Sequence, residues 1–191
     1  MSVAKYISIN DIFLDIASGM DDNVFFYWGD LKTEKLQQLN KHPRLPLIFM
    51  IIPDSVPVND SGDTNRISTN VNVSFIIIDR YRKIDNASQY SRKQERLQKD
   101  VNEQVGQIMF NFIDAIENSG FISGKPSFSY SENLPLGMML RNNENGKMEH
   151  LFNGYYCGFM LDVTCSIKRF NASCNNPIFK NSENWVTKLA Y

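Results

Sequence analysis

The longest regular pattern of apolar positions runs from Ser91 to Asn118. Apolar residues recur there every three or four positions, which predicts an amphipathic helix with one buried stripe. The stripe consists of Leu97, Val101, Val105, Ile108, Met109, Phe112 and Ile116. Ser91 and Gln94 have the spacing of a capping box, and Gly120 is the expected stop signal. At 1.5 Å per residue the helix is about 40 Å long, enough to cross a whole sheet. Gly106, in its middle, predicts a close approach of two backbones.

Four segments have the composition or period of strands. They are Val24–Trp28, the continuous apolar run Leu47–Ile52, the alternating stretch Asn70–Asp79 and the long alternating stretch Gly154–Phe170. Pro46 and Pro53 bound the second, which predicts a central strand buried on both faces. The fourth has 17 residues and would span about 55 Å, so we expect it to bend or to outrun its sheet. Weaker strands are predicted at 125–131 and 138–142, with a turn at 142–146.

The remaining segments complete an α+β chain. A short helix is predicted over residues 8–18, with Ser8 as its N-cap, Asp11 at its positive end and Gly19 as a left-handed stop. Thr33 is the expected cap of one more short helix. Residues 54–68 form the predicted long loop, and 171–191 an extended C-terminal tail. The expected fold is a small antiparallel or mixed β-sheet crossed by one long helix, with an N-terminal helix, in a single domain over residues 1–170.

Composition places the chain among soluble globular proteins. Of its 191 residues 42% are hydrophobic, 12% aromatic and 21% charged, so intrinsic disorder is excluded for the whole chain. The formal net charge of −1 excludes an overall basic footprint for nucleic acid. No signal peptide is visible after Met1, and no apolar run is long enough to span a bilayer, which favours a cytosolic assembly environment without membrane contact.

Candidate chemistry is sparse. The three cysteines, Cys157, Cys165 and Cys174, are an odd number, and the first two lie on the inward face of the last strand, where a thiol packs as a small apolar group. His42 and His150 are far apart and have no partner at metal-binding or nucleophile spacing. The chain has no phosphate-binding loop and no dinucleotide-binding glycine pattern. We therefore expect no catalytic residue, no metal and no cofactor.

One nuclease family offers a counter-argument. It places Pro-Asp at a strand end and Glu-x-Lys or Asp-x-Lys on the next strand, where the carboxylates hold Mg²⁺. Pro53-Asp54 fits the first part, but the next strand ends Asp79-Arg80-Tyr81 and lacks the lysine. A metal-dependent nuclease is therefore the weakest alternative, and ordinary turn chemistry explains Asp54.

The distribution of charge is more informative than its total. Residues 1–30 carry a net charge of −4 and residues 80–99 a net charge of +5. The acidic group is Asp11, Asp15, Asp21, Asp22 and Asp30, and the basic group is Arg80, Arg82, Lys83, Arg92, Lys93, Arg96 and Lys99. Three interpretations remain open: a solvated helix face, two complementary patches that pack head to tail in a ring, or a basic surface for nucleic acid.

The order of elements resembles that of the tail-terminator and tail-completion proteins of tailed bacteriophages. The similar segments are Lys41–Pro53, a proline-containing strand that ends in proline, Val71–Asp79 followed by the Ser91–Asn118 helix, and the closing strand Tyr155–Phe170. They cover most of residues 1–170 without a diagnostic motif, and the long loop and the tail exceed the compact family pattern.

The resemblance implies a structural virion protein at the head–tail junction, assembled in the bacterial host cytoplasm. Such proteins form homo-oligomeric rings, hexamers or dodecamers, that contact neighbouring neck, portal or tail proteins while DNA passes through the lumen. The loop 54–68 and the tail 171–191 would then contact neighbouring rings. The principal alternative is a nucleic-acid-binding accessory protein that uses the basic residues of the 80–99 segment.

Overall fold

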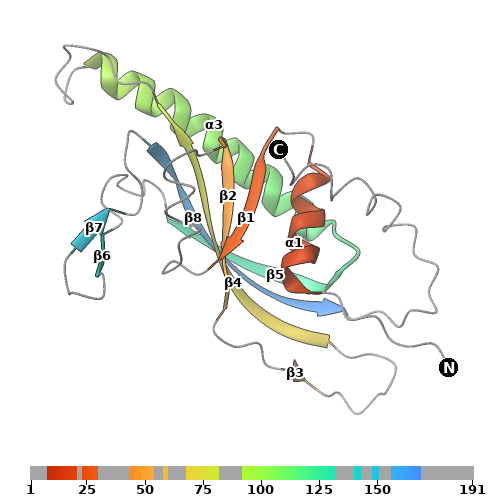
Figure 1. Ribbon diagram of the computed structural model, residues 1–191. Helices are drawn as coiled ribbons and strands as arrows, with labels where there is room; N and C mark the ends of the chain where they lie inside the picture. Colours follow the sequence, from red (N-terminus) through yellow and green to blue (C-terminus); the bar gives the residue numbers. More distant parts are fainter. Residues whose placement is uncertain are drawn as a thin grey trace.

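The computed structural model describes residues 8–20, 23–29, 44–53, 58–59, 68–81, 92–131, 140–142, 148–150 and 156–168. Its elements, labelled in Figure 1, are α1 (Ile9–Ser18), β1 (Phe25–Gly29), β2 (Leu47–Ile51), β3 (Val58–Asn59), β4 (Ser68–Arg80), α3 (Arg92–Glu117), β5 (Ile122–Ser131), β6 (Leu140–Asn142), β7 (Met148–His150) and β8 (Tyr156–Lys168). This is the predicted α+β class, and the long helix lies across the sheet as expected.

The main sheet is mixed. Its strands follow the order β1-β2-β4-β8-β5, with the short β3 beside β4. β1 and β2 are parallel, and the other pairs of this sheet are antiparallel. The longest pairing joins β4 and β8, from Ser68 opposite Lys168 to Arg80 opposite Tyr156. Both long strands curve along their length, so the predicted bend of the last strand is confirmed (Figure 1).

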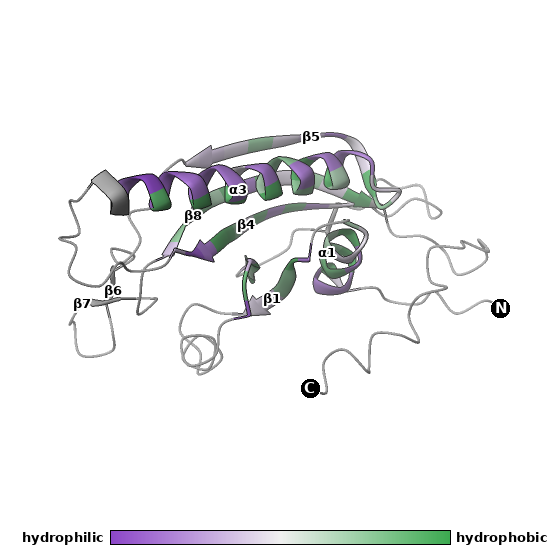
Figure 2. Cartoon of the chain, turned by 90° about the horizontal axis from the view of Figure 1, so that it is seen from above, coloured by the Kyte–Doolittle hydropathy of each residue, from purple (hydrophilic) through white to green (hydrophobic). Residues whose placement is uncertain are grey.

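One face of the sheet packs against both helices and forms the main core. Phe75, at the centre of β4, contacts Phe13 of α1 with ring centroids 5.0 Å apart and Phe112 of α3 at 5.1 Å, both edge to face. Hydrophobic and hydrophilic residues alternate along α3, as expected for a helix with one buried side (Figure 2). The predicted inward residues of β8, Cys157 and Cys165 included, are buried.

The opposite face is buried over only part of the sheet. A second cluster there contains Leu47, Phe49, Ile76, Ile78 and Tyr156. β2 is therefore buried on both faces, as its uninterrupted apolar sequence predicts. β4 changes along its length: Asn70 and Asn72 alternate with buried valines, whereas Phe75 to Ile78 are all buried. The alternation predicted through Asp79 therefore ends at Phe75.

The helix signals are confirmed in part. The Asp11 amide donates to Ser8 Oγ at 3.1 Å, which is the expected cap of α1. Gly19, however, has φ −76° and is right-handed; its amide donates to the carbonyls of Asp15 and Ile16, so this helix ends without a left-handed residue. At the end of α3 the amides of Asn118 and Ser119 close the last turn, and Gly124 is the positive-φ glycine among the described residues, so Gly120 makes no left-handed stop.

Two other predictions are corrected. Gly106 faces a side chain and not a backbone: a Cβ there would lie 3.4 Å from Cζ of Phe159. The predicted loop 54–68 contains β3, whose Val58 pairs with Thr69, because β4 extends back to Ser68 and offers it an edge. The weaker strand predicted at 138–142 is confirmed at residues 140–142, which pair in a separate two-stranded sheet with β7, a strand that the sequence did not predict. The short helix expected from Thr33 and the tail 171–191 lie outside the described residues.

Candidate functional site

A group of titratable side chains lies where β4 ends and β8 begins. Asp79 is paired with Cys157 in the sheet, and Arg80 with Tyr156. Burial and the Asp79 carboxylate raise the pKa of the Cys157 thiol to about 12, and burial raises the pKa of the Tyr156 hydroxyl. Burial also raises the pKa of Asp79, although the Arg80 amide donates to its Oδ1. These directions keep the thiol protonated at neutral pH, which suits packing and not nucleophilic attack.

The described residues contain no group of three or more His, Cys, Asp or Glu side chains that could hold a metal ion. Asp54, on which the nuclease alternative depends, lies outside the described residues, as do His42 and Cys174. The second cysteine in the sheet, Cys165, is buried and its pKa is raised by burial to about 11.

The basic group is only partly in the described region. Arg80 ends β4, and Arg96 and Lys99 lie exposed on the first turns of α3, where Arg92 and Lys93 begin the helix. Arg82 and Lys83 lie outside the described residues. Lys99 Nζ is 3.6 Å from Glu103 Oε1, and Glu95 and Asp100 share these turns, so the helix start mixes both signs. A surface with charges of both signs attracts a phosphate backbone less strongly than the net charge of +5 over residues 80–99 suggested.

The acidic group is represented by Asp11 and Asp15 of α1, since Asp21, Asp22 and Asp30 lie outside the described residues. Asp11 is exposed. Asp15 is partly buried, and desolvation raises the pKa of its carboxyl.

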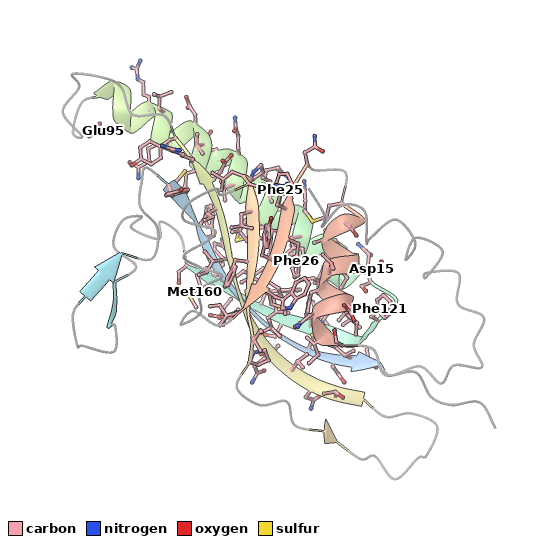
Figure 3. All side chains as sticks on the ribbon, in the orientation of Figure 1. Asp15, Phe25, Phe26, Glu95, Phe121 and Met160 are labelled. Atoms are coloured by element: carbon pink, nitrogen blue, oxygen red, sulfur yellow. The ribbon has the colours of Figure 1, made fainter. Side chains whose placement is uncertain are left out.

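Both views place α1, which carries Asp11 and Asp15, away from the start of α3, which carries Arg96 and Lys99. α3 begins where β4 ends, and α1 lies beside the other end of α3 (Figures 1 and 2). Figure 3 labels Glu95 at the start of α3 and Asp15 on α1, at the two ends. The described acidic residues of α1 and the described basic residues at the start of α3 therefore lie apart on one subunit.

An exposed aromatic pair lies at the edge of the main sheet, and the sequence analysis did not single it out. Phe110 of α3 is 51% exposed and Tyr130 of β5 44% exposed, with ring centroids 5.9 Å apart. Tyr130 also contacts the buried Phe159 at 6.4 Å, so the exposed pair is anchored to the core. Phe110 lies outside the predicted apolar stripe of α3, and this position was the sequence feature that could have indicated an exposed aromatic residue.

The uncovered part of the opposite sheet face carries small polar side chains. On β4 they include Asn70, Asn72 and Ser74, on β8 Asp162 and Thr164, and on β5 Ser127 and Ser129. The Ser74 hydroxyl donates to Asp162 Oδ1 at 2.5 Å, across the β4–β8 pair. This face therefore supplies hydroxyl and amide groups and one carboxylate, which already accepts from a serine hydroxyl.

Comparison with models of known protein families finds no match to this chain, and comparison with curated proteins finds none either. Among the described helices none has the length and apolarity needed to cross a membrane.

Proposed function

We propose that this chain is a structural subunit that assembles with copies of itself into a ring at the head–tail junction of a tailed bacteriophage. The observation that carries the proposal is the placement of opposite charges at opposite ends of one α+β domain. Asp11 and Asp15 lie on α1, and Arg80 and Arg96 lie where β4 ends and α3 begins. Head-to-tail packing brings these ends together, and a fixed rotation between neighbours closes a ring.

The arrangement of elements supports the same proposal. The order helix, two strands, a long strand, a long helix and further strands is the order on which the resemblance to tail terminators rests. The raised pKa values of the Cys157 and Cys165 thiols are consistent with side chains that pack in the core of a structural subunit.

Light scattering coupled to size exclusion tests the proposal on the full chain. One subunit weighs 22.0 kDa, so a hexamer has a mass of about 132 kDa and a dodecamer about 264 kDa. We expect one of these masses at low salt, a lower mass at high salt because screening weakens charge contacts, and rings in negative-stain images. A mass of about 22 kDa at every concentration, alone and with neck partners, contradicts the proposal.

A variant with Arg92, Lys93 and Arg96 replaced by serine separates the ring from the nucleic-acid alternative. The ring proposal predicts that this variant loses mass in light scattering. The alternative predicts an unchanged mass together with loss of salt-sensitive binding to a duplex of random sequence.

A further inference from the structure

The open edge of β5 has unequal halves. β5 is the last strand in the sheet order, so one side of its backbone pairs with no strand of the described chain. In the first half, the register against β8 shifts between Ser123 and Ser127. The residues between them are Gly124, with φ 74°, Lys125, which is exposed, and Pro126. A bulge, a lysine and a proline are the usual devices that keep another strand from pairing with an edge.

The second half, Ser127–Ser131, has none of these devices. Its serines alternate with Phe128 and Tyr130, and the aromatic residues lie on the face that carries α3. An unpaired edge beside the exposed Phe110–Tyr130 pair offers both backbone hydrogen bonds and an apolar surface. These are the two components by which a sheet edge binds an added strand.

We propose that residues 185–191 of a second copy of this chain add to this edge as a strand, so that each subunit of the ring binds the next. This inference rests on the proposed function and names the contact that builds the ring. The segment reads Trp-Val-Thr-Lys-Leu-Ala-Tyr, with Trp185, Leu189 and Tyr191 on one face of an extended strand. The apolar face of this segment would pack against Phe110 and Tyr130. The opposite face, which includes the small Ala190 and the charged Lys188, would lie on the same side of the sheet as the serines of β5.

Charge and connectivity support a neighbour's segment. Residues 169–191 carry three basic and one acidic side chain, and Asp114 and Glu117 are exposed one and two turns after Phe110 on α3. β8 ends beside Ile122, across the bulge from Ser127–Ser131. The 16 residues 169–184 reach about 50 Å when extended, which is long enough for residues 185–191 to leave their own subunit.

Two full-length double variants test the contact. The edge variant carries Phe110→Ser and Tyr130→Ser, and the tail variant carries Trp185→Ser and Leu189→Ser. Each removes one half of the contact, so each alone should give a mass of about 22 kDa by light scattering. Mixed in equal amounts they retain one intact tail and one intact edge, which predicts a heterodimer of about 44 kDa and no ring. Ile52→Ser, at an exposed apolar residue after β2, is the matched control and should keep the wild-type mass.

Hydrogen exchange of the wild-type chain keeps the test decisive if a variant fails to fold. The amides of Ser127–Ser131 that point away from β8 should be protected in the oligomer and lose that protection on dilution to monomer, whereas those that pair with β8 stay protected in both. Protection that is independent of concentration means that the tail binds its own chain, which overturns the inference. A wild-type mass in both variants, or no heterodimer on mixing, also overturns it and leaves the ring itself standing. A wild-type chain that is always monomeric overturns the proposed function with it.

Discussion

At the scale of single residues, position in the sheet decides what a side chain contributes. Phe75 and Phe110 are both phenylalanines, but Phe75 is fully buried between Phe13 and Phe112 whereas Phe110 is half exposed. Burying a phenylalanine side chain stabilises the folded state by about 1.5–3 kcal/mol. Phe75 therefore holds both helices on the sheet, and Phe110 is available for contact with another molecule.

The thiol of Cys157 makes stability depend on alkaline pH. Its pKa is about 12 in the folded chain, against an ordinary value of 9.0. The unfolded chain therefore releases this proton first, and the free energy of unfolding should fall as the pH rises from 9 toward 12. We expect the urea midpoint to drop between pH 8 and pH 10, and to drop less in Cys157→Ala.

Alkylation gives an independent check of the same thiol. Iodoacetamide at pH 8 should label native Cys157 and Cys165 far more slowly than the urea-unfolded chain, as read by mass spectrometry. Labelling of Cys157 at the rate of a free cysteine contradicts the assigned burial.

At the scale of elements, the sequence predicted the regular segments well because their signals are local. The stripe of α3, the apolar run of β2 and the alternation of β8 each identify an element from neighbouring residues alone. The strands that the sequence missed are β3 and β7, which are only two and three residues long and form by pairing with a nearby strand. β3 exists because β4 offers it an edge, and residues 140–142 pair with β7 and not with the main sheet.

Two glycines in neighbouring elements should respond oppositely to alanine. A Cβ at Gly158 of β8 would overlap the Ile77 carbonyl oxygen of β4, so Gly158→Ala should destabilise the fold by about 2–3 kcal/mol. At Gly106 of α3 the nearest atom is a Phe159 ring carbon at 3.4 Å, an ordinary contact. Gly106→Ala should therefore stabilise the fold by about 0.5–1 kcal/mol, since alanine favours the helix.

Urea denaturation of both glycine variants at pH 7 measures this difference. Equal effects of the two substitutions would contradict the packing described for β4 and β8.

At the scale of the whole molecule, the net charge of −1 conceals an uneven distribution, with acidic side chains on α1 and both signs at the start of α3. α1 carries Asp11 and Asp15 at one end, and the start of α3 carries Arg96 and Lys99 at the other. The sequence predicted two charged groups, but only the packing of α1 beside the far end of α3 sets them apart.

The substitution Asp15→Asn should have opposite effects on the stability of one subunit and on the assembly of subunits. Burial raises the pKa of Asp15, so its ionised form costs the folded state stability as the pH rises above 3.8 through the raised value. Asparagine removes that cost, and the subunit should gain roughly 0.2–0.5 kcal/mol at pH 7, a small gain because the side chain is partly exposed.

The same variant should assemble less well, because it removes a charge from the acidic end. Thermal unfolding at low protein concentration measures the first effect, and light scattering at low salt the second. A variant with unchanged assembly would show that Asp15 takes no part in the subunit contact.

The sequence by itself determined the α+β class, the long helix and the principal strands, since hydrophobic period and capping residues act within a few positions of one another. It also determined that Cys157 and Cys165 pack inward. The tertiary structure alone decided which edge of the sheet pairs with no other described strand and that Phe110 meets Tyr130 there. It also decided that the described acidic residues of α1 lie apart from the described basic residues at the start of α3. These features join residues far apart in the chain, and a one-dimensional pattern carries no information about which distant surfaces meet.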